Sequence, residues 1–313
     1  MRKYCVIGSP VGHSKSPGLF ERFSSERGFV YGKDVEYLKN EIKNRDELAN
    51  FVKELRAGIW SGCNVTMPWK TDMVTYLDEL SETAKVTDSV NTVSAVNGYL
   101  YGDSTDGSGM LNAVADAAGY NLRKDMLVIL GCGGAARSII AEAIQRRYKK
   151  VIIVCRGVKK MPEVSAGIKI TEASGNVLPK KKSNLELTYE MLERMGVNAR
   201  LYPEESKGSE SVVSFLDSSD RDSLSKALSE AEILINSTPL GMLDGNGNEN
   251  RLPLPEDMCP DKNLIVADCV YNPDVTLLIK KAEEAGCKTV KGIRMLEEQA
   301  KCGVELLLNG IHN

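Results

Sequence analysis

A glycine-rich turn between an apolar run and a helix constrains the fold of this chain more than any other feature. The run Met126–Leu130 is suited to a strand buried on both faces. It is followed by Gly131-x-Gly133-x-x-Ala136, by an amphipathic helix to about Arg147, and by a second apolar run at Val151–Cys155. A strand, a glycine turn, a helix and a second strand in this order form the context that a dinucleotide-binding fingerprint requires. The sequence therefore predicts a Rossmann-like unit.

Each position of this turn has its own physical reason. Gly131 permits the tight turn, Gly133 lets the backbone approach a pyrophosphate, and Ala136 lets the helix pack closely on the strand. The pyrophosphate would lie at a helix N-terminus, with Gly134 and Ala135 beside it, where free N–H groups and the helix dipole favour negative charge. A turn without function is the alternative, and the spacing of the whole unit favours cofactor binding.

The end of the second strand predicts which nicotinamide cofactor binds. A carboxylate there would bind the ribose 2′-hydroxyl, whereas a basic residue accommodates a 2′-phosphate. The sequence Cys155-Arg156-Gly157-Val158-Lys159-Lys160 has no acid in reach. Arg156 can stack on adenine or bind the phosphate, and Lys159 can add charge, although both can also be solvated loop cations. We therefore expect NADP(H).

Short β-branched runs alternate with helical periods along the chain, which predicts an α/β protein with largely parallel sheets. A length of 313 residues favours two domains. We predict a substrate-binding domain over 1–106, completed by 287–313, and a Rossmann-like NADP-binding domain over 107–286. The last helix would thus return to the first domain. A polar excursion over about 157–211 interrupts the second domain, with one helix around Leu185–Met195.

Composition excludes several classes of protein. The formal net charge of -3 gives no electrostatic case for nucleic acid or for an anionic membrane. Eight cysteines without a C-x-x-C pair and only two histidines argue against a metal site and favour reduced, buried thiols. No apolar stretch is long enough for a signal peptide or a membrane span. We expect a cytoplasmic protein, monomeric or homodimeric, with a small-molecule substrate.

Several ordered motifs resemble the shikimate/quinate dehydrogenase family across nearly the whole chain, except for the polar excursion. They are Gly8-Ser9-Pro10-Val11-Gly12-His13-Ser14-Lys15-Ser16-Pro17, Gly62-Cys63-Asn64-Val65-Thr66-Met67-Pro68-Trp69-Lys70, Val90-Asn91-Thr92, Ser104-Thr105-Asp106-Gly107, Gly131–Arg137, Asn236-Ser237-Thr238-Pro239-Leu240-Gly241-Met242, Asp268-Cys269-Val270-Tyr271-Asn272-Pro273 and Gly292-Ile293-Arg294-Met295-Leu296-Glu297-Glu298-Gln299.

The resemblance implies an NADP-dependent oxidoreductase that interconverts 3-dehydroshikimate and shikimate in the chorismate pathway. It implies that Lys70 and Asp106 flank the reacting C3 oxygen. The substrate carboxylate would be bound by Ser14, Ser16 and Tyr271, and the ring hydroxyls by Thr66, Asn91 and Gln299. On the cofactor side it implies the Gly131–Ala136 turn, Arg156, Thr238, Cys269 and Gly292.

Singly, each residue has a plainer interpretation. Ser14 and Ser16 beside prolines can cap a helix, Lys70 can be a solvated lysine, and Asp106 before Gly107 can be a turn residue. As an ordered set they favour proton transfer by Lys70, oriented by Asp106, and we give His13 a packing or hydrogen-bonding role.

The sequence departs from the family pattern where Phe20-Glu21 stand in place of a His-Asn pair, Ser104 in place of Asn and Asp88 in place of Gly. These departures leave open a quinate/shikimate enzyme of broader substrate or NAD use. A catalytically silent, ligand-sensing relative is the alternative from another class, although it would have no need to keep both Lys70 and Asp106.

Overall fold

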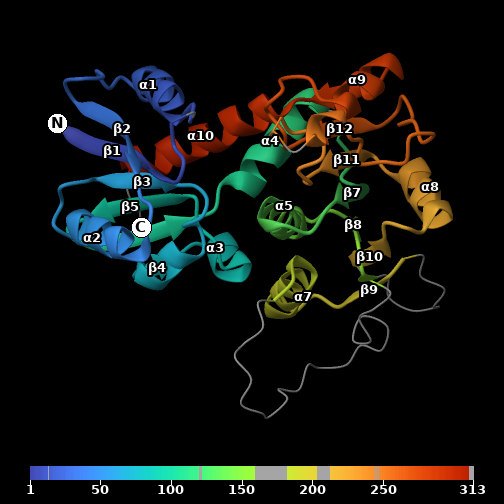
Figure 1. The fold of residues 1–313 in the computed structure, drawn as a ribbon, viewed down its shortest axis with the longest axis horizontal. Coiled ribbons are helices and arrows are strands. Elements are labelled where there is room, and N and C mark those ends of the chain that lie inside the picture. The colour runs from blue at the N-terminus through green and yellow to red at the C-terminus, as the bar shows by residue number, and fades with distance from the viewer. Residues whose placement is uncertain are drawn as a thin grey trace, which may run out of the picture. The chain divides into compact units, whose positions relative to one another are not determined.

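The computed structural model has the predicted α/β class and divides into two compact units (Figure 1). Unit 1 comprises Met1–Gly109 with Leu296–Asn313, and unit 2 comprises Met110–Met295. The structure describes residues 1–12, 14–119, 122–158, 182–202, 212–243, 245 and 247–309.

Unit 1 is built on a six-stranded mixed sheet with the order β2-β1-β3-β5-β6-β4. Strand β1 is parallel to β2 and β3, whereas β5 is antiparallel to β3 and β6. The strands are β1 Arg2–Gly8, β2 Val35–Glu41, β3 Gly62–Val65, β4 Glu79–Leu80, β5 Thr92–Val96 and β6 Tyr99–Asp103. The helices are α1 Ser16–Glu26, α2 Arg45–Arg56, the 3-10 helix η1 Asp72–Tyr76, α3 Glu82–Thr87, and parts of α4 Asp106–Ala118 and α10 Gly292–Asn309.

Strand β1 is buried on both faces, and its alternate residues enter two different cores. Tyr4 packs in one cluster with Phe20 of α1 and Leu307 of α10. Cys5, one position along, packs in the other cluster with Phe51 of α2. Because the side chains of a strand alternate between faces, one short strand joins both layers of helices to the sheet.

The hairpin between β5 and β6 was not predicted. Val96 pairs with Tyr99, so the loop consists of Asn97 and Gly98 alone. Their φ angles are 51° and 81°, as a two-residue turn that follows the twist of the strands requires. Asn-Gly is the strongest short hairpin signal in a sequence, and here it closes the antiparallel half of the sheet.

Unit 2 is built on a seven-stranded sheet with the order β13-β12-β11-β7-β8-β10-β9, in which every pairing is parallel. The strands are β7 Met126–Leu130, β8 Lys150–Cys155, β9 Ala199–Leu201, β10 Val213–Asp217, β11 Ile233–Asn236, β12 Ile265–Asp268 and β13 Lys288–Val290. The helices are α5 Gly134–Gln145, α7 Asn184–Arg194, α8 Arg221–Glu230, α9 Leu277–Glu284 and the 3-10 helix η4 Asn248–Asn250. Leu224 of α8 and Leu278 of α9 pack in one core cluster with Val128 and Val266 of the sheet.

The order of the strands confirms the Rossmann-like unit. Strand β7 is central, and the chain continues on one side of it through β8, the edge strand β9 and then β10, which lies between them. It then crosses to β11 on the other side of β7. The glycine turn after β7 therefore lies where the strand order reverses, which is where open α/β sheets bind ligands.

The predicted polar excursion over 157–211 is partly described, as residues 157–158 and 182–202. The helix predicted around Leu185–Met195 is confirmed as α7, Asn184–Arg194. The sequence did not predict β9, which adds an edge strand to the sheet beside β10.

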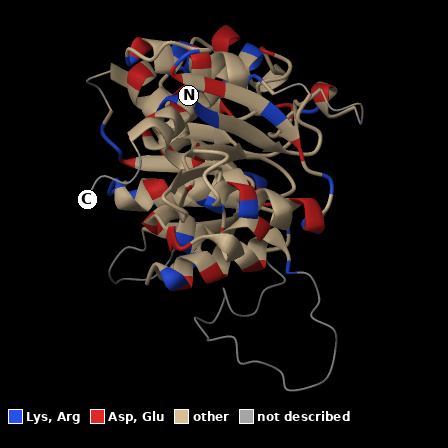
Figure 2. Cartoon of the chain, turned by 90° about the vertical axis from the view of Figure 1, so that its left-hand side faces the viewer, with Lys and Arg blue, Asp and Glu red and all other residues tan. Residues whose placement is uncertain are grey.

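Basic and acidic residues are interspersed along the described helices, strands and loops of the cartoon in Figure 2. This distribution agrees with a net charge of only -3. None of the described helices has the length and apolar composition needed to cross a bilayer.

Candidate active site

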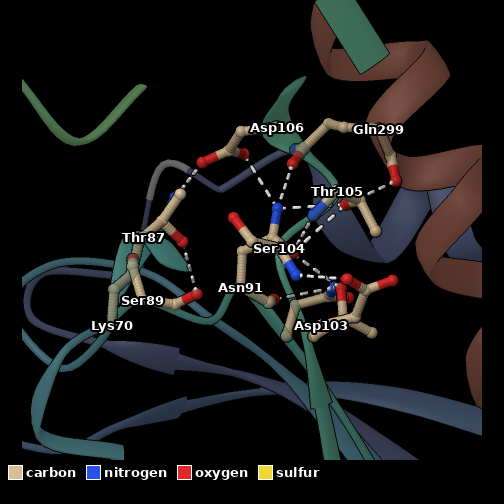
Figure 3. A network of polar contacts seen from close by, with 11 residues as sticks. Lys70, Thr87, Ser89, Asn91, Asp103, Ser104, Thr105, Asp106 and Gln299 are labelled. Carbon is tan, nitrogen blue, oxygen red and sulfur yellow. Dashed lines mark hydrogen bonds and ion pairs between the residues drawn. The ribbon is translucent and has the colours of Figure 1, made fainter. Parts of the chain in front are cut away.

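Lys70 and Asp106, which lie far apart in the sequence, form an ion pair in unit 1 (Figure 3). Lys70 follows β3, and Asp106 is the first residue of α4. The distance between Lys70 Nζ and Asp106 Oδ2 is 2.6 Å, and the side chains are 29% and 12% exposed. The Lys70 carbonyl accepts from the N–H of Val90, which fixes the lysine backbone beside the start of β5. The site thus holds an amine and a carboxylate in direct contact, and both side chains keep some exposure.

Asn91 is the centre of the polar network around this pair. Its Nδ2 lies 2.8 Å from Asp106 Oδ1, 3.0 Å from Thr105 Oγ1 and 2.9 Å from Gln299 Oε1. Its Oδ1 accepts from the N–H of Thr105 at 3.0 Å and from the hydroxyl of Thr92 at 3.0 Å. Because Asn91 is 4% exposed, these bonds hold its amide in one orientation.

Gln299 reaches the network from α10 because a glycine lets two helices approach closely. A Cβ at Gly109 of α4 would lie 2.6 Å from the backbone nitrogen of Gln299, closer than real side chains come. Thr105 completes the contact by donating its hydroxyl to the Gln299 carbonyl at 3.1 Å. The glutamine is therefore positioned by backbone packing as well as by its own side chain.

The two motif serines lie next to each other at the start of α1. Ser14 Oγ donates to Ser16 Oγ at 3.1 Å and accepts from the N–H of Ser16 at 3.2 Å. This turn opens the helix, but the N-cap is Lys15 and no side chain forms a capping bond, so the plainer capping interpretation is wrong. Both hydroxyls remain partly exposed. The pair can therefore still donate to an anion such as a carboxylate.

Tyr37 and Asn64 connect these serines to the centre of the network. Ser16 hydrogen-bonds Tyr37, whose pKa burial raises well above its usual value. The Tyr37 hydroxyl donates to Asn64 Oδ1 at 2.7 Å, and Asn64 Nδ2 donates to Thr92 Oγ1 at 3.0 Å and to the Asn91 carbonyl at 3.2 Å. A chain of hydrogen bonds thus runs from Tyr37 to Lys70. Sequence reasoning gave no role to Tyr37, Asn64 or Thr105, although the last two lie within the quoted motifs.

Thr66 is held at the end of β3 by its N–H bond to the carbonyl of Ile7 at 2.9 Å. A Cβ at Gly8 would collide with Cγ2 of Thr66. The glycine that opens the serine motif is therefore needed for the close approach of these two segments.

The departures at Asp88 and Ser104 have structural counterparts. Asp88 ends α3 with φ 50°, in the left-handed region that favours glycine. Ser104 is 2% exposed and lies next to Thr105 of the network. Position 104 is thus part of the packing beneath the polar site.

Unit 2 contains a cavity of about 820 Å³ at the predicted dinucleotide site, a volume within the usual range for ligand pockets. It is lined by the glycine turn, the end of β8, the segment after β11 and the start of α7. The residues are Leu130, Gly131, Cys132, Gly133, Val154, Cys155, Arg156, Gly157, Ser183, Asn184, Leu185, Glu186, Ser218, Ser237, Thr238, Pro239, Leu240, Asn248, Arg251 and Pro253.

The glycine turn has the shape that a phosphate cradle needs. Gly131 has φ 100°, and a Cβ there would lie 3.0 Å from Ser237 Oγ and Thr238 Cγ2. At Gly133 and Gly134 a Cβ would meet nothing within 4 Å, so their backbone faces open space. Ala136 is fully buried in α5. These residues fit a dinucleotide pyrophosphate, which would occupy the space in front of the N–H groups.

Thr238 and Cys269 are held by a buried network at the ends of β11 and β12. The Thr238 hydroxyl and N–H both donate to Asn236 Oδ1, at 2.7 and 3.0 Å. Asn236 Nδ2 donates to Asp268 Oδ1 at 2.9 Å, and the N–H of Cys269 donates to the Asn236 carbonyl at 2.8 Å. Burial raises the pKa of Asp268 to about 6.

The remaining predicted residues lie at separate positions. Tyr271 follows β12 in unit 2 and is 42% exposed. Gly292 begins α10, where a Cβ would collide with the Val270 carbonyl. Lys159 and His13 lie outside the described residues.

Sequence reasoning did not assign the start of α7 to the cavity. Ser183 accepts from the N–H of Glu186, and Glu186 accepts from the N–H of Ser183, which forms a capping box. The Thr188 hydroxyl donates to the Cys132 carbonyl at 3.0 Å, so α7 contacts the glycine turn directly. The Ser-x-x-Glu pattern signals a helix N-terminus.

Comparisons with known proteins give consistent results. A sequence profile described as the shikimate dehydrogenase substrate binding domain matches residues 6–93. A shikimate dehydrogenase (NADP(+)) of Alkaliphilus oremlandii is 32% identical over 301 residues, which cover 96% of this chain and 89% of the relative.

Two solved structures are similar over nearly the whole chain. The shikimate 5-dehydrogenase of Listeria monocytogenes, in complex with shikimate and NAD, is 29% identical with a TM-score of 0.76, covering 99% of this chain and 92% of that one. The shikimate 5-dehydrogenase of Thermus thermophilus, in complex with NADP(H) and shikimate, is 25% identical with a TM-score of 0.70, covering 100% and 95%.

Proposed function

The chain belongs to the shikimate dehydrogenase family, and from this premise we propose that it catalyses the reversible NADPH-dependent reduction of 3-dehydroshikimate to shikimate. The resemblance inferred from the motifs is thereby confirmed. The activity is that of an oxidoreductase acting on a CH–OH group, in the pathway to chorismate and the aromatic amino acids.

The observation that carries the proposal is the Lys70–Asp106 pair at 2.6 Å, surrounded by the amides of Asn91 and Gln299. Oxidation of the C3 hydroxyl releases a proton, and reduction of the ketone requires one. The Lys70 amine accepts and returns this proton, while Asp106 orients the amine and hydrogen-bonds the hydroxyl. Positioned proton transfer of this kind typically contributes about 10²–10⁴-fold to the rate.

The substrate's other groups match the polar residues of the site. Ser14 and Ser16 offer adjacent hydroxyls to the carboxylate, and Tyr271 would add a third. Thr66, Asn91 and Gln299 bind the ring hydroxyls. Because the buried bonds of Asn91 hold its amide in place, a substrate that lacks a matching hydroxyl would leave polar groups unpaired.

The cavity of unit 2 supports binding of the cofactor. The Gly131–Ala136 turn would bind the pyrophosphate, Arg156 the 2′-phosphate, and Thr238, Cys269 and Gly292 would lie toward the nicotinamide. A cofactor held by these residues would supply hydride acceptance in one direction and hydride donation in the other.

The test is a nicotinamide absorbance assay of the wild type and of Lys70→Met. The variant is expected to lose about 10²–10⁴-fold in kcat, because it loses the proton carrier, and to retain NADPH binding. Lys85→Met is the matched control: Lys85 forms an equally short surface pair with Glu82, at 2.7 Å, in the same unit. A Lys70→Met enzyme with unchanged kcat would contradict the assigned role.

A panel of two substrates and two cofactors separates the alternatives. Reduction of NADP⁺ with shikimate alone supports the proposal. Turnover of quinate, or use of NAD⁺, would indicate the broader enzyme that the departures at Asp88 and Ser104 leave open. A folded protein that is silent with every pair would favour the ligand-sensing relative. The cytoplasmic location and the monomeric or homodimeric state stay predictions.

A further inference from the structure

Two cysteines, Cys132 and Cys155, lie side by side in the wall of the nucleotide cavity. The N–H of Gly131 donates to the Val154 carbonyl at 2.8 Å, which ties the glycine turn to the end of β8. Cys132 directly follows Gly131 and Cys155 directly follows Val154, so this bond places the two cysteines next to each other. The dinucleotide fingerprint does not specify the residue at position 132. Cofactor binding therefore does not explain why two cysteines stand next to each other here.

Cys132 has the surroundings of a reactive thiol. It is partly exposed and directly precedes Gly133, the N-cap of α5, so the positive end of the helix dipole is close. The neighbouring Cys155 thiol lowers the pKa of Cys132, burial opposes this shift, and the charges of Arg137 and Arg156 lower the pKa further. A thiolate in a partly exposed, electropositive place is the form of cysteine that attacks peroxides.

Cys155 has the properties of the second, resolving thiol. It is buried, and the neighbouring Cys132, together with burial, raises its pKa far above the usual value. It therefore stays protonated until its neighbour has reacted. Burial also raises the pKa of Cys5 and of Cys63, which lie in the core of unit 1.

We propose that Cys132 and Cys155 form a reversible oxidation site, through which a hydroperoxide lowers the affinity of the cavity for its nucleotide. The Cys132 thiolate attacks the peroxide, so that an S–O bond forms, the O–O bond breaks and hydroxide or alkoxide leaves. Cys155 then attacks the Cys132 sulfenic acid: the S–S bond forms, the S–O bond breaks, and the departing hydroxide takes the Cys155 proton as water. Two thiols lose two electrons, the peroxide gains them, and an external dithiol reverses the change.

The glycine turn explains why oxidation affects binding. Cys132 lies between Gly131 and Gly133, whose backbone faces the space for the pyrophosphate, and its carbonyl is bound by Thr188. A disulfide to Cys155 draws this turn toward β8 and shifts the N–H groups that would hold the phosphates. The oxidation of the two cysteines does not depend on the proposed function, whereas the effect of this oxidation on turnover rests on it.

The first readout is chemical and needs no activity. The wild type, Cys132→Ser, Cys155→Ser and the control Cys259→Ser, which alters an exposed cysteine, are treated with hydrogen peroxide and mapped by mass spectrometry without reduction. The wild type and the control are expected to give a Cys132–Cys155 linked peptide. Cys155→Ser is expected to stop at a sulfenic acid on Cys132, which dimedone traps. Oxidation of the exposed Cys259 in the wild type shows that the peroxide has been effective. If Cys259 is oxidised and no Cys132–Cys155 linked peptide is found, the proposal is overturned.

The second readout is NADPH binding, followed by its fluorescence. Oxidised wild type is expected to bind about tenfold more weakly, the effect of losing one hydrogen bond to a charged group, and to recover with a dithiol. Cys132→Ser is expected to keep its own affinity after peroxide. A linked peptide without a change in affinity, or an equal loss in peroxide-treated Cys132→Ser, would overturn the regulatory part. Reduced wild type that fails to bind NADPH would instead contradict the proposed cofactor, while the peptide map still tests the thiols.

Discussion

The free energy of unfolding of unit 2 is expected to depend less on pH in the Asp268→Asn variant than in the wild type. Asp268 is fully buried on β12 and accepts from Asn236, Thr276 and the N–H of Val270. Burial raises its pKa from 3.8 to about 6, so between these values the folded state keeps a proton that the unfolded chain has released. The stability that this group contributes is therefore full below the lower value and is lost as the pH rises through the upper one.

The magnitude follows from the size of the shift. At about 1.36 kcal/mol per pKa unit, a rise of roughly two units corresponds to ~3 kcal/mol. Between about pH 4 and about pH 7 the wild type should lose ~2–3 kcal/mol from this group, roughly a 50-fold change in the opening equilibrium. Asparagine keeps an oxygen for Asn236 and Val270 and can donate to the Thr276 hydroxyl, but it has no proton to release. Relative to the wild type, the variant should thus gain stability as the pH rises.

The difference in opening free energy between the variant and the wild type can be measured by amide hydrogen exchange of β12 at a series of pH values, corrected for the intrinsic exchange rate. The two tryptophans, Trp60 and Trp69, both lie in unit 1, so their fluorescence during unfolding is the internal reference. The remaining carboxylates are the same in both proteins. The difference between their two curves of opening free energy against pH therefore gives the contribution of Asp268. Curves that run parallel from about pH 4 to about pH 7 would refute the argument from burial.

Two further predictions concern the cofactor and the packing of helices. Arg156→Ala should weaken NADP⁺ by about 10–100-fold, the loss of a charge-assisted bond to phosphate, and NAD⁺ much less. Titration with both nucleotides checks this, and an equal loss for both would count against the 2′-phosphate contact. Gly109→Ala should destabilise unit 1 by about 1–3 kcal/mol and raise KM by displacing Gln299, as thermal unfolding and kinetics would show. Gly18→Ala, on a helix with open space around the glycine, is the control, and equal stability of both variants would contradict the steric argument.

Much of the site could be predicted because its chemistry is concentrated in short motifs. In the glycine turn, position 131 needs a residue that adopts a positive φ angle, which favours glycine, and position 136 needs a small residue that fits a fully buried place, which favours alanine. Lys70 and Asp106 could be paired only through the family resemblance, since no local pattern links residues from two separate segments. The structure now brings these two side chains to 2.6 Å.

The connecting residues could not be predicted in the same way. Tyr37 packs in a core cluster, as an aromatic residue of a strand is expected to do. Its hydroxyl reaches Asn64 only because β2 and β3 lie on either side of β1. Strand β9 is three residues long and depends on pairing with β10, so it has no periodicity of its own. The Asn97-Gly98 turn is different, because the Asn-Gly pair itself indicates a hairpin and could have been used to predict it.

The helix that brings Gln299 to the network is also the last described part of unit 1 to leave the ribosome. When residues 1–109 have been synthesised, the face of the sheet around Tyr4 and Phe20 still lacks Leu307 and its neighbours on α10. The described strands of unit 2 are complete by Val290, before most of that helix exists. During synthesis the nucleotide-binding fold can therefore mature first, while the nascent substrate unit carries an uncovered apolar face that chaperones can recognise. The polar network around Asn91 can be completed only when α10 has been synthesised and brings Gln299 to it.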